Sequence, residues 1–150
     1  MRVVIQRVSR ASVKTTEGHH QAINKGLMVL VGIGLEDTEG DADWLASKIT
    51  AMRIFDDMDG IMNLSLMDVA GELLVVSQFT LHARTKKGNR PSYIDAAPPE
   101  KSIPLYAYFV KKLKTLTGRP VATGIFGAQM EVELINDGPV TIVMDTAHKA

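Results

Sequence analysis

The stretch "GLMVLVGIG", residues 26–34, decides the fold because it is a short, continuous apolar run bounded by glycines. Such a run is typical of a strand that is buried on both faces. A second run, "GELLVVSQFTL" at residues 71–81, has the same character until it ends in polar side chains. A helical pattern over residues 38–54 separates the two runs. The residues of its apolar face are Trp44, Leu45, Ile49 and Met52.

The remaining pattern completes a mixed α/β order. We expect further strands at residues 2–8, 12–16, 130–135 and 140–144, from their β-branched composition. A second helix ends near Thr117 and Gly118. Three prolines lie near its start, and we expect them in or before its first turn, because proline disrupts the interior of a helix. These are Pro98, Pro99 and Pro104. The order predicts a sheet with two helices packed on one side, in a single domain of residues 1–150.

The composition limits the function. The 17 basic and 17 acidic residues cancel, so we do not expect a protein that coats nucleic acid. The chain has no cysteine, which excludes disulfides and thiolate catalysis. We expect surface histidines rather than a metal site, and no cofactor. No stretch is typical of a signal peptide or a membrane span, so the expected location is the cytoplasm.

The polar end of the second buried run is the first candidate site. Ser77, Gln78 and Thr80 place three polar side chains in four positions around Phe79, and buried polar groups need partners or mark a site. A cluster that only satisfies the end of a strand is the alternative. Ser77 or Thr80 could be a nucleophile, but neither has a Gly-x-Ser-x-Gly elbow around it. Strand alternation also places His82 out of phase with Ser77.

Two further segments admit both a structural and a binding interpretation. The loop "ARTKKGNRPS", residues 83–92, either is a solvated loop or holds phosphates. Its cations are Arg84, Lys86, Lys87 and Arg90. Phe126 and Met130, which flank "GAQ", either belong to the core or enclose a flat base.

The stretch "NDGPV", residues 136–140, lies between the last two predicted strands and has the composition of a hairpin turn. Pro139 does not suit that turn, because it removes a backbone donor where the next strand begins. From local composition alone, a turn at an edge strand is the default, and trans is the usual state of an X–Pro bond.

Taken together, "MRVVIQRV", "VVSQFTL", "NRPS" and "NDGPVT" resemble the D-aminoacyl-tRNA deacylases of the DTD type over essentially the whole chain. The resemblance implies an α/β fold of two packed, barrel-like β-sheets with two helices outside, and a homodimer. It implies an enzyme that hydrolyses the ester between a D-amino acid and the 3′ adenosine of tRNA, as a proofreading step in translation. Because glycine has no Cβ to exclude, we expect glycyl-tRNA to be a substrate too.

The resemblance also implies roles for single residues. Those beside the scissile ester would be Ser77, Gln78, Phe79 and Thr80. Phe126 and Met130 would hold the terminal adenine, and Ala97 would also contact the substrate. Gly138 and Pro139, joined by a cis bond, would enter the pocket of the other subunit and reject L-amino acids, with Arg7 orienting them. The four cations of residues 83–92 would meet tRNA phosphates.

Other functions stay open beside this one. A non-enzymatic binder of tRNA or single-stranded DNA could use the same pocket, although neutral net charge disfavours broad DNA affinity. A generic serine esterase would depend on Ser77. Within the deacylase, Thr80 could act as a nucleophile, or backbone donors and the 2′-hydroxyl of the tRNA could serve water attack.

Overall fold

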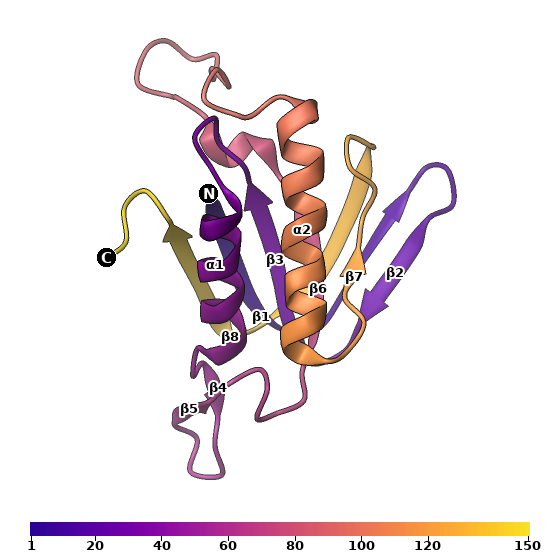
Figure 1. Cartoon of the computed structure of the whole chain (residues 1–150). Helices are drawn as coiled ribbons and strands as arrows, with labels where there is room; N and C mark the ends of the chain where they lie inside the picture. The colour runs from indigo at the N-terminus through magenta and orange to yellow at the C-terminus, as the bar shows by residue number, and fades with distance from the viewer.

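The computed structural model describes residues 1–150 and has two helices in front of a curved sheet (Figure 1). Its elements follow the chain as β1 (Arg2–Thr15), β2 (His20–Ile23), β3 (Gly26–Gly32), α1 (Glu39–Ala51), β4 (Phe55–Asp56), β5 (Met62–Leu64), β6 (Glu72–Ser77), the 3₁₀ turn η1 (Phe79–His82), α2 (Pro99–Thr117), β7 (Ala122–Thr123) and β8 (Met130–Asp145). No helix is both long and apolar enough to cross a membrane.

The two buried apolar runs form the centre of the main sheet. β3 and β6 pair in parallel, and β7 extends this parallel part beyond β6. Parallel neighbours need a crossover, and α1 and α2 lie in the two crossovers. Both helices cover the same face of the sheet (Figure 1). Gly26 is required where β3 and β6 begin to pair, because a Cβ there would lie 1.9 Å from the Glu72 carbonyl oxygen.

β1 joins the parts of the main sheet, because it pairs with three other strands. One of its edges pairs first with β3 and then with β2, and its other edge pairs with β8, all antiparallel. β2 and β7 then approach each other, because Thr123 N–H donates to Gln21 Oε1 at 2.6 Å and its carbonyl lies 2.8 Å from His19 Nε2. The main sheet is thus a nearly closed barrel, beside a second small sheet of β4 and β5, as the resemblance implies.

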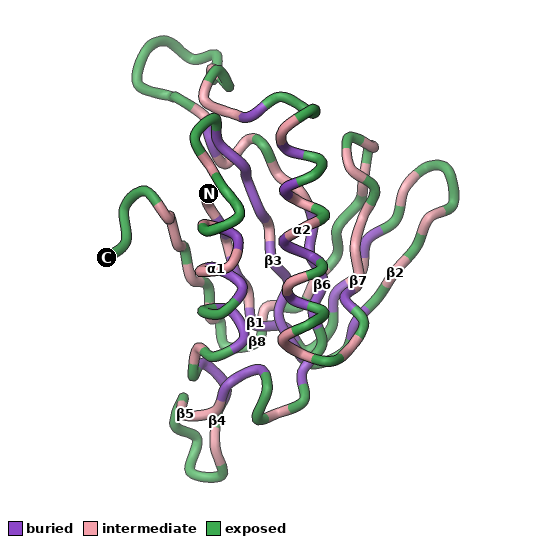
Figure 2. Tube along the Cα trace, in the orientation of Figure 1, coloured by how far each residue is buried: buried purple, intermediate pink, exposed green.

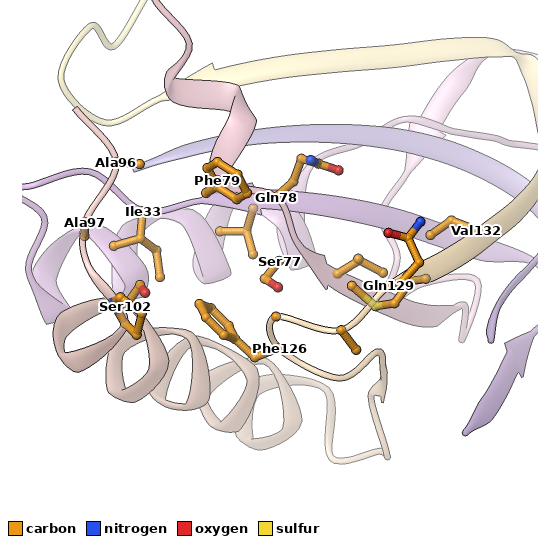
Figure 3. A pocket seen from close by; sticks show the side chains of 16 residues that line it. Ile33, Ser77, Gln78, Phe79, Ala96, Ala97, Ser102, Phe126, Gln129 and Val132 are labelled. Carbon is orange, nitrogen blue, oxygen red and sulfur yellow. The ribbon is translucent and has the colours of Figure 1, made fainter. Parts of the chain in front are cut away.

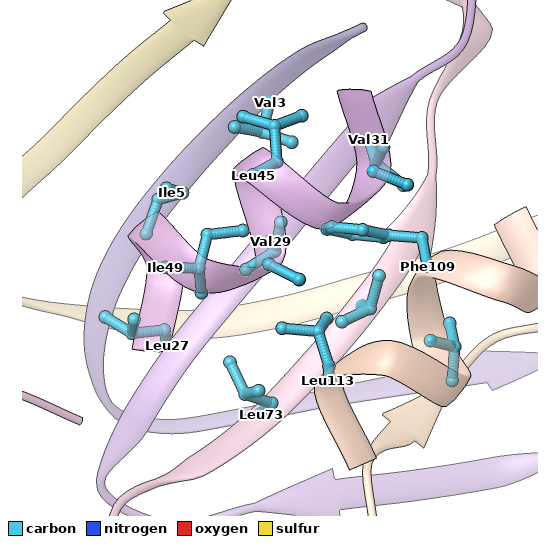
Figure 4. Packing of buried hydrophobic residues seen from close by; sticks show 14 of the residues in the cluster. Val3, Ile5, Leu27, Val29, Val31, Leu45, Ile49, Leu73, Phe109 and Leu113 are labelled. Carbon is cyan, nitrogen blue, oxygen red and sulfur yellow. The ribbon is translucent and has the colours of Figure 1, made fainter. Parts of the chain in front are cut away.

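Two apolar cores lie on opposite faces of the sheet. The larger one fills the space between the strands and the helices, where Val29 lies near Phe109 and Leu73 lies near Leu113 (Figure 4). The smaller one lies within the barrel-like half and includes Met28 and Leu74. Neighbouring residues of β3 and β6 thus face different cores, which is why residues 27–31 of β3 and residues 73–76 of β6 are all apolar (Figure 2).

β1 changes face between its two halves. Val3 and Ile5 belong to the core beneath the helices, whereas Ala11 and Val13 belong to the core inside the barrel, although all four positions are odd. The pairing with β8 shows the cause, because Ser9 is an extra residue between two paired positions. Such a bulge moves every later side chain to the opposite face.

The prediction of two separate strands at residues 130–135 and 140–144, with a turn between them, is wrong. β8 is one strand that pairs with β1 on both sides of this segment, Asn136 opposite Val8 and Thr141 opposite Gln6. Residues 137–140 therefore bulge out of β8 opposite Arg7 alone. The chain resumes its direction after the bulge, so Pro139 does not have to donate to the ladder. We call residues 137–140 the β8 bulge.

Smaller corrections concern single residues. Residues 12–16 are not a separate strand, because β1 runs unbroken to Thr15. Pro99 begins α2 as expected, but Pro104 lies inside the helix. The second buried strand ends at Ser77, since the chain then turns into η1. That turn buries His82 and brings its Nε2 to 3.0 Å from the Gly32 carbonyl, so His82 is not a surface residue.

Candidate active site

A cavity of about 590 Å³ opens where β6 passes into η1, between the start of α2 and the segment before β8 (Figure 3). The residues that line it are Val31, Ile33, Val76, Ser77, Gln78, Phe79, Ala96, Ala97, Pro99, Ser102, Phe126, Gly127, Ala128, Gln129, Met130 and Val132. Most of the lining is apolar. The volume is within the usual range for a site that encloses a small molecule or the end of a larger one.

Six of the residues singled out in the sequence meet in this cavity, although they come from three separate stretches of the chain. They are Ser77, Gln78, Phe79, Ala97, Phe126 and Met130. Phe126 lies across the cavity from the end of β6 (Figure 3). The cavity therefore joins the polar strand end to the aromatic and thioether pair that could enclose a base.

The polar strand end is shaped by the passage from β6 into η1. Gln78 N–H donates to the Val31 carbonyl at 2.7 Å, which extends the pairing with β3 by one residue. The Gln78 side-chain amide donates to Thr80 Oγ1 at 2.5 Å. Thr80 does not line the cavity, and its hydroxyl contacts an amide rather than a base. The N–H groups of Phe79 and Thr80 open a helical turn, so they have no acceptor within it.

The β8 bulge lies outside this cavity. Gly138 and Pro139 are exposed, and the peptide bond between them is cis, as the resemblance implies. Gly138 has φ +140°, and a Cβ there would lie 2.8 Å from Val140 Cγ2 and 3.3 Å from Arg7 Nη2. The segment needs glycine at this position because an L side chain rarely adopts such a φ.

Arg7 is the buried support of the β8 bulge. Its side chain is only 8% exposed. Nε donates to the Asp137 carbonyl at 2.9 Å, while Nη1 donates to the Ile54 carbonyl at 2.8 Å and to Asp56 Oδ1 at 3.2 Å. One guanidinium thus connects the bulge to the segment that leads into the β4–β5 hairpin.

The cations of residues 83–92 differ from one another in their partners. Arg84 forms a two-point ion pair with Asp95, with Nε–Oδ2 at 2.5 Å and Nη2–Oδ1 at 2.7 Å. The hydrogen bonds from Arg84 lower the pKa of the Asp95 carboxyl. Lys86, Lys87 and Arg90 are exposed and form no ion pair. Arg84 therefore holds the loop, and three charges remain free to meet a phosphate.

Tyr106 on α2 does not line the cavity, but its ring lies beside that of Phe126, which does, and the sequence analysis did not single it out. Its hydroxyl donates to the Val75 carbonyl at 2.8 Å, and its ring centroid lies 6.0 Å from that of Phe126. Burial raises the pKa of Tyr106 to about 12. The available signal was a phenol within an otherwise apolar stripe, because a buried hydroxyl needs a partner. No group of three or more potential ligand side chains is placed to hold a metal ion.

Solved structures define the class of fold. One, titled "c-Myc DNA Unwinding Element Binding Protein", matches with a TM-score of 0.90 and 41% identity, over 97% of this chain and 99% of that one. Another, titled a probable eukaryotic D-amino acid tRNA deacylase, has a TM-score of 0.83 over 95% of this chain and 97% of that one. At 16% identity, the second match supports the fold alone.

The sequence comparisons are more specific. The family model described as D-Tyr-tRNA(Tyr) deacylase matches residues 4–145. A protein of Bacteroides fragilis named D-aminoacyl-tRNA deacylase is 62% identical, and one of Flavobacterium johnsoniae with the same name is 61% identical, each over 99% of both chains. The chain belongs to the D-Tyr-tRNA(Tyr) deacylase family. The family recognised from the sequence motifs is confirmed, and so is the expectation of an enzyme.

Proposed function

We propose that this protein hydrolyses the ester bond of D-aminoacyl-tRNA, releasing the amino acid and free tRNA as a proofreading step in translation. Full-length relatives that carry the name D-aminoacyl-tRNA deacylase support the reaction class. The observation that carries the proposal is the cavity of about 590 Å³, which brings the polar end of β6 opposite Phe126 and Met130. Because charged tRNA is the substrate, the reaction belongs in the cytoplasm, and it needs no cofactor.

The two sides of the cavity suit the two parts of an aminoacyl-adenosine. Phe126 and Met130 offer an aromatic face and a polarisable sulfur, which suit an adenine ring. Ala97 lines the same cavity and contacts the substrate. The ester lies against the end of β6, where Ser77 and Gln78 present polar groups beside the backbone of Phe79. This arrangement puts the scissile carbonyl next to main-chain donors.

Catalysis uses water rather than a covalent intermediate. The N–H groups of Phe79 and Thr80 stabilise the developing oxyanion, and the 2′-hydroxyl of the substrate orients the attacking water. An activated threonine needs a neighbouring base, and the hydrogen-bond partner of Thr80 is the Gln78 amide. A Thr80→Ala variant should keep part of its activity. Complete loss with normal binding, together with an acyl-enzyme trapped in the wild type, would establish the covalent route instead.

We further propose that the β8 bulge of one copy completes the cavity of a second copy. Gly138 and Pro139 are exposed and do not line the cavity of their own chain. β8 pairs only with β1, so its other edge is free along a 16-residue strand. Val132, Ile135 and Val143 are also exposed, by 37%, 45% and 69%. A long free edge with apolar side chains suits a homodimer.

In that homodimer the main chain of Gly138 and Pro139 forms a wall beside the amino acid. The wall leaves no room for a Cβ of L configuration, so L-aminoacyl-tRNA is excluded by steric conflict. Arg7 orients the wall through the Asp137 carbonyl. Glycine has no Cβ, so glycyl-tRNA is hydrolysed as well.

The deciding assay compares D-, L- and glycyl-esters of one tRNA with purified protein. We expect hydrolysis of the D and glycyl esters and none of the L ester. Hydrolysis of the L ester at a similar rate would remove the proofreading function, and an intact glycyl ester at high enzyme would exclude the main-chain wall.

Mixing two inactive variants tests the shared site. Gly138→Ala impairs the wall only, and Phe126→Ala combined with Met130→Ala impairs the adenine side only. After unfolding and refolding together, half of the dimers contain both variants and each has one intact site. We therefore expect about a quarter of the wild-type activity. No recovery would show that wall and cavity belong to the same chain.

A second candidate function has one specific observation in its favour. The relative with a TM-score of 0.90 and 41% identity is titled as a binder of a DNA unwinding element. The zero net charge of this chain disfavours broad affinity for DNA. Tight binding of single-stranded DNA by protein that deacylates no tRNA ester would favour this function. Deacylation that is lost when Pro139 is replaced would exclude it as the main role.

A further inference from the structure

An aromatic pair stands at the mouth of the cavity. Phe79 lines the cavity and is 55% exposed, while Tyr93 is 39% exposed and does not line it. Their ring centroids lie 5.1 Å apart with planes at 76°, so one ring meets the other edge-on. Two exposed aromatic rings in contact beside a cavity form an apolar patch, and such patches can mark a binding site.

Tyr93 is held firmly although it follows an exposed loop. Arg84 and Ser92 exchange two backbone hydrogen bonds, of 2.8 and 3.0 Å, which close the loop just before Tyr93. The ion pair of Arg84 with Asp95 fixes the other side of Tyr93. The Tyr93 carbonyl also accepts from Ala96 N–H at 3.1 Å. The ring is therefore positioned before any ligand arrives, which lowers the entropic cost of binding.

The surroundings of the pair are basic. Lys86, Lys87 and Arg90 lie on the loop that Arg84 and Ser92 close, and none of them has an ion-pair partner. Exposed aromatic faces combined with free cations are the means by which proteins hold single-stranded nucleic acid, since bases stack on the rings and phosphates meet the charges. Neutral apolar partners would gain nothing from these cations.

We propose that Phe79 and Tyr93 form a stacking site for the unpaired nucleobase that precedes the terminal adenosine of the substrate. The inference rests on the proposed function, because the esterified adenosine then fills the cavity. The nucleotide strand must leave past the mouth, where Phe79 is the wall inside and Tyr93 is the exposed ring outside. The site takes a cytidine, the nucleotide next to the terminal adenosine in tRNA, through its flat face.

Two small substrates isolate this site. One is adenosine carrying a 3′ D-tyrosyl ester, and the other is the dinucleotide cytidylyl-adenosine with the same ester. Neither contains an acceptor stem, so they differ by one nucleotide only. We expect wild-type kcat/KM to be about tenfold higher for the dinucleotide, the effect of one stacked base. Tyr93→Leu keeps an apolar side chain against Phe79 but removes the flat face, and it should abolish this advantage.

Two variants serve as controls. Tyr93→Phe keeps the ring and should keep the dinucleotide advantage. Ile94→Ala changes the adjacent exposed apolar residue, 64% exposed, and should alter neither substrate. Sedimentation of each variant shows whether the copy number has changed.

Several outcomes would overturn the proposal. They are a Tyr93→Leu protein that still prefers the dinucleotide ester, a Tyr93→Leu protein that loses kcat/KM equally on both esters, and a change in the number of chains per assembly. The second would mean that Tyr93 only supports Phe79, and the third that the ring contacts another copy of the chain. A wild type that hydrolyses neither ester would contradict the proposed function itself, and with it this site.

Discussion

The cavity and the β8 bulge differ in whether one chain forms the whole feature. One copy of the chain forms the cavity by itself, because β6, η1, α2 and the segment before β8 together enclose about 590 Å³. The bulge is equally well supported, by the buried Arg7, but Gly138 and Pro139 do not line that cavity. A well-supported segment that does not contribute to the site of its own chain is expected when two copies of the chain share each site. The difference supports dividing recognition and selection between two copies.

Gly138→Ala should give the largest effect. The new Cβ meets Val140 and Arg7 at φ +140°, so the bulge must move. Displacement of a selecting group by about 1 Å can cost roughly 100-fold in rate, and we expect a loss of that order in D-aminoacyl-tRNA hydrolysis. Steady-state kinetics with each ester would measure it.

The matched control is Gly18→Ala, at φ +94° in open space between β1 and β2. It carries comparable backbone strain without contacts near the site. Full activity in Gly138→Ala would remove the bulge from the reaction and would leave the cavity wall as the whole site.

Arg7→Ala should follow in size. It removes three hydrogen bonds from a charged group that is almost fully buried, and we expect a loss of about 3 kcal/mol in the free energy of unfolding. Hydrolysis should fall too, because the Asp137 carbonyl loses its donor. Urea denaturation and kinetics would separate the two effects.

Arg10→Ala provides the comparison on the same strand. Arg10 pairs with Glu133 at the surface, 59% exposed, so its loss should cost well under about 1 kcal/mol. Equal destabilisation by the two changes would contradict a special support for the bulge.

Neutralising the free cations of residues 83–92 tests whether this loop contacts tRNA phosphates. Lys86→Gln, Lys87→Gln and Arg90→Gln together should raise KM for tRNA by about tenfold at low salt and flatten its salt dependence, because phosphate contacts release counterions. Arg84 stays unchanged, since it holds the loop through Asp95. Lys111→Gln with Lys114→Gln on α2 is the control. An unchanged salt slope would make residues 83–92 an ordinary solvated loop.

Tyr106→Phe should have the smallest effect, and it concerns the side chain beside the cavity residue Phe126. The lost hydrogen bond to Val75 should cost about 1 kcal/mol of stability near pH 8. Because burial raises the folded-state pKa to about 12, the stability that Tyr106 contributes is complete below the unfolded pKa and lost as pH rises towards 12. Because a shift of about two pKa units outweighs about 1 kcal/mol, the free energies of unfolding of the two proteins should become equal between about pH 10 and 12, and the Tyr106→Phe protein should be the more stable one near pH 12. A difference that stays constant with pH would contradict a buried phenol.

The sequence patterns revealed the parts of the fold that local composition controls. β3 and β6 are buried on both faces and read as continuous apolar runs, and both helices show their stripes. The β8 bulge was not recognisable, because a hairpin turn and a bulge share their residues. What distinguishes them is pairing with β1, far away in the chain. The bulge at Ser9 was not recognisable from composition either, because apolar and polar residues alternate on both sides of it.

The candidate site was predictable to a different degree. Polar residues at the end of a buried strand pointed to Ser77 and Gln78, but composition and periodicity could not show that Phe126 lies opposite them. The family motifs supplied that pairing before the structure did. Tyr93 and Tyr106 were missed because their roles depend on ring contacts with Phe79 and Phe126. A basic sequence likewise could not show that Arg84 is already paired.

The change of face in β1 has a consequence for how the chain holds together. One strand supplies Val3 and Ile5 to the core under the helices and Ala11 and Val13 to the core inside the barrel. Neither core can lose this strand while the other keeps it, so the two halves melt as one cooperative unit. Ser9 is the residue on which that coupling depends, because without it the second half of β1 would turn its apolar side chains to solvent.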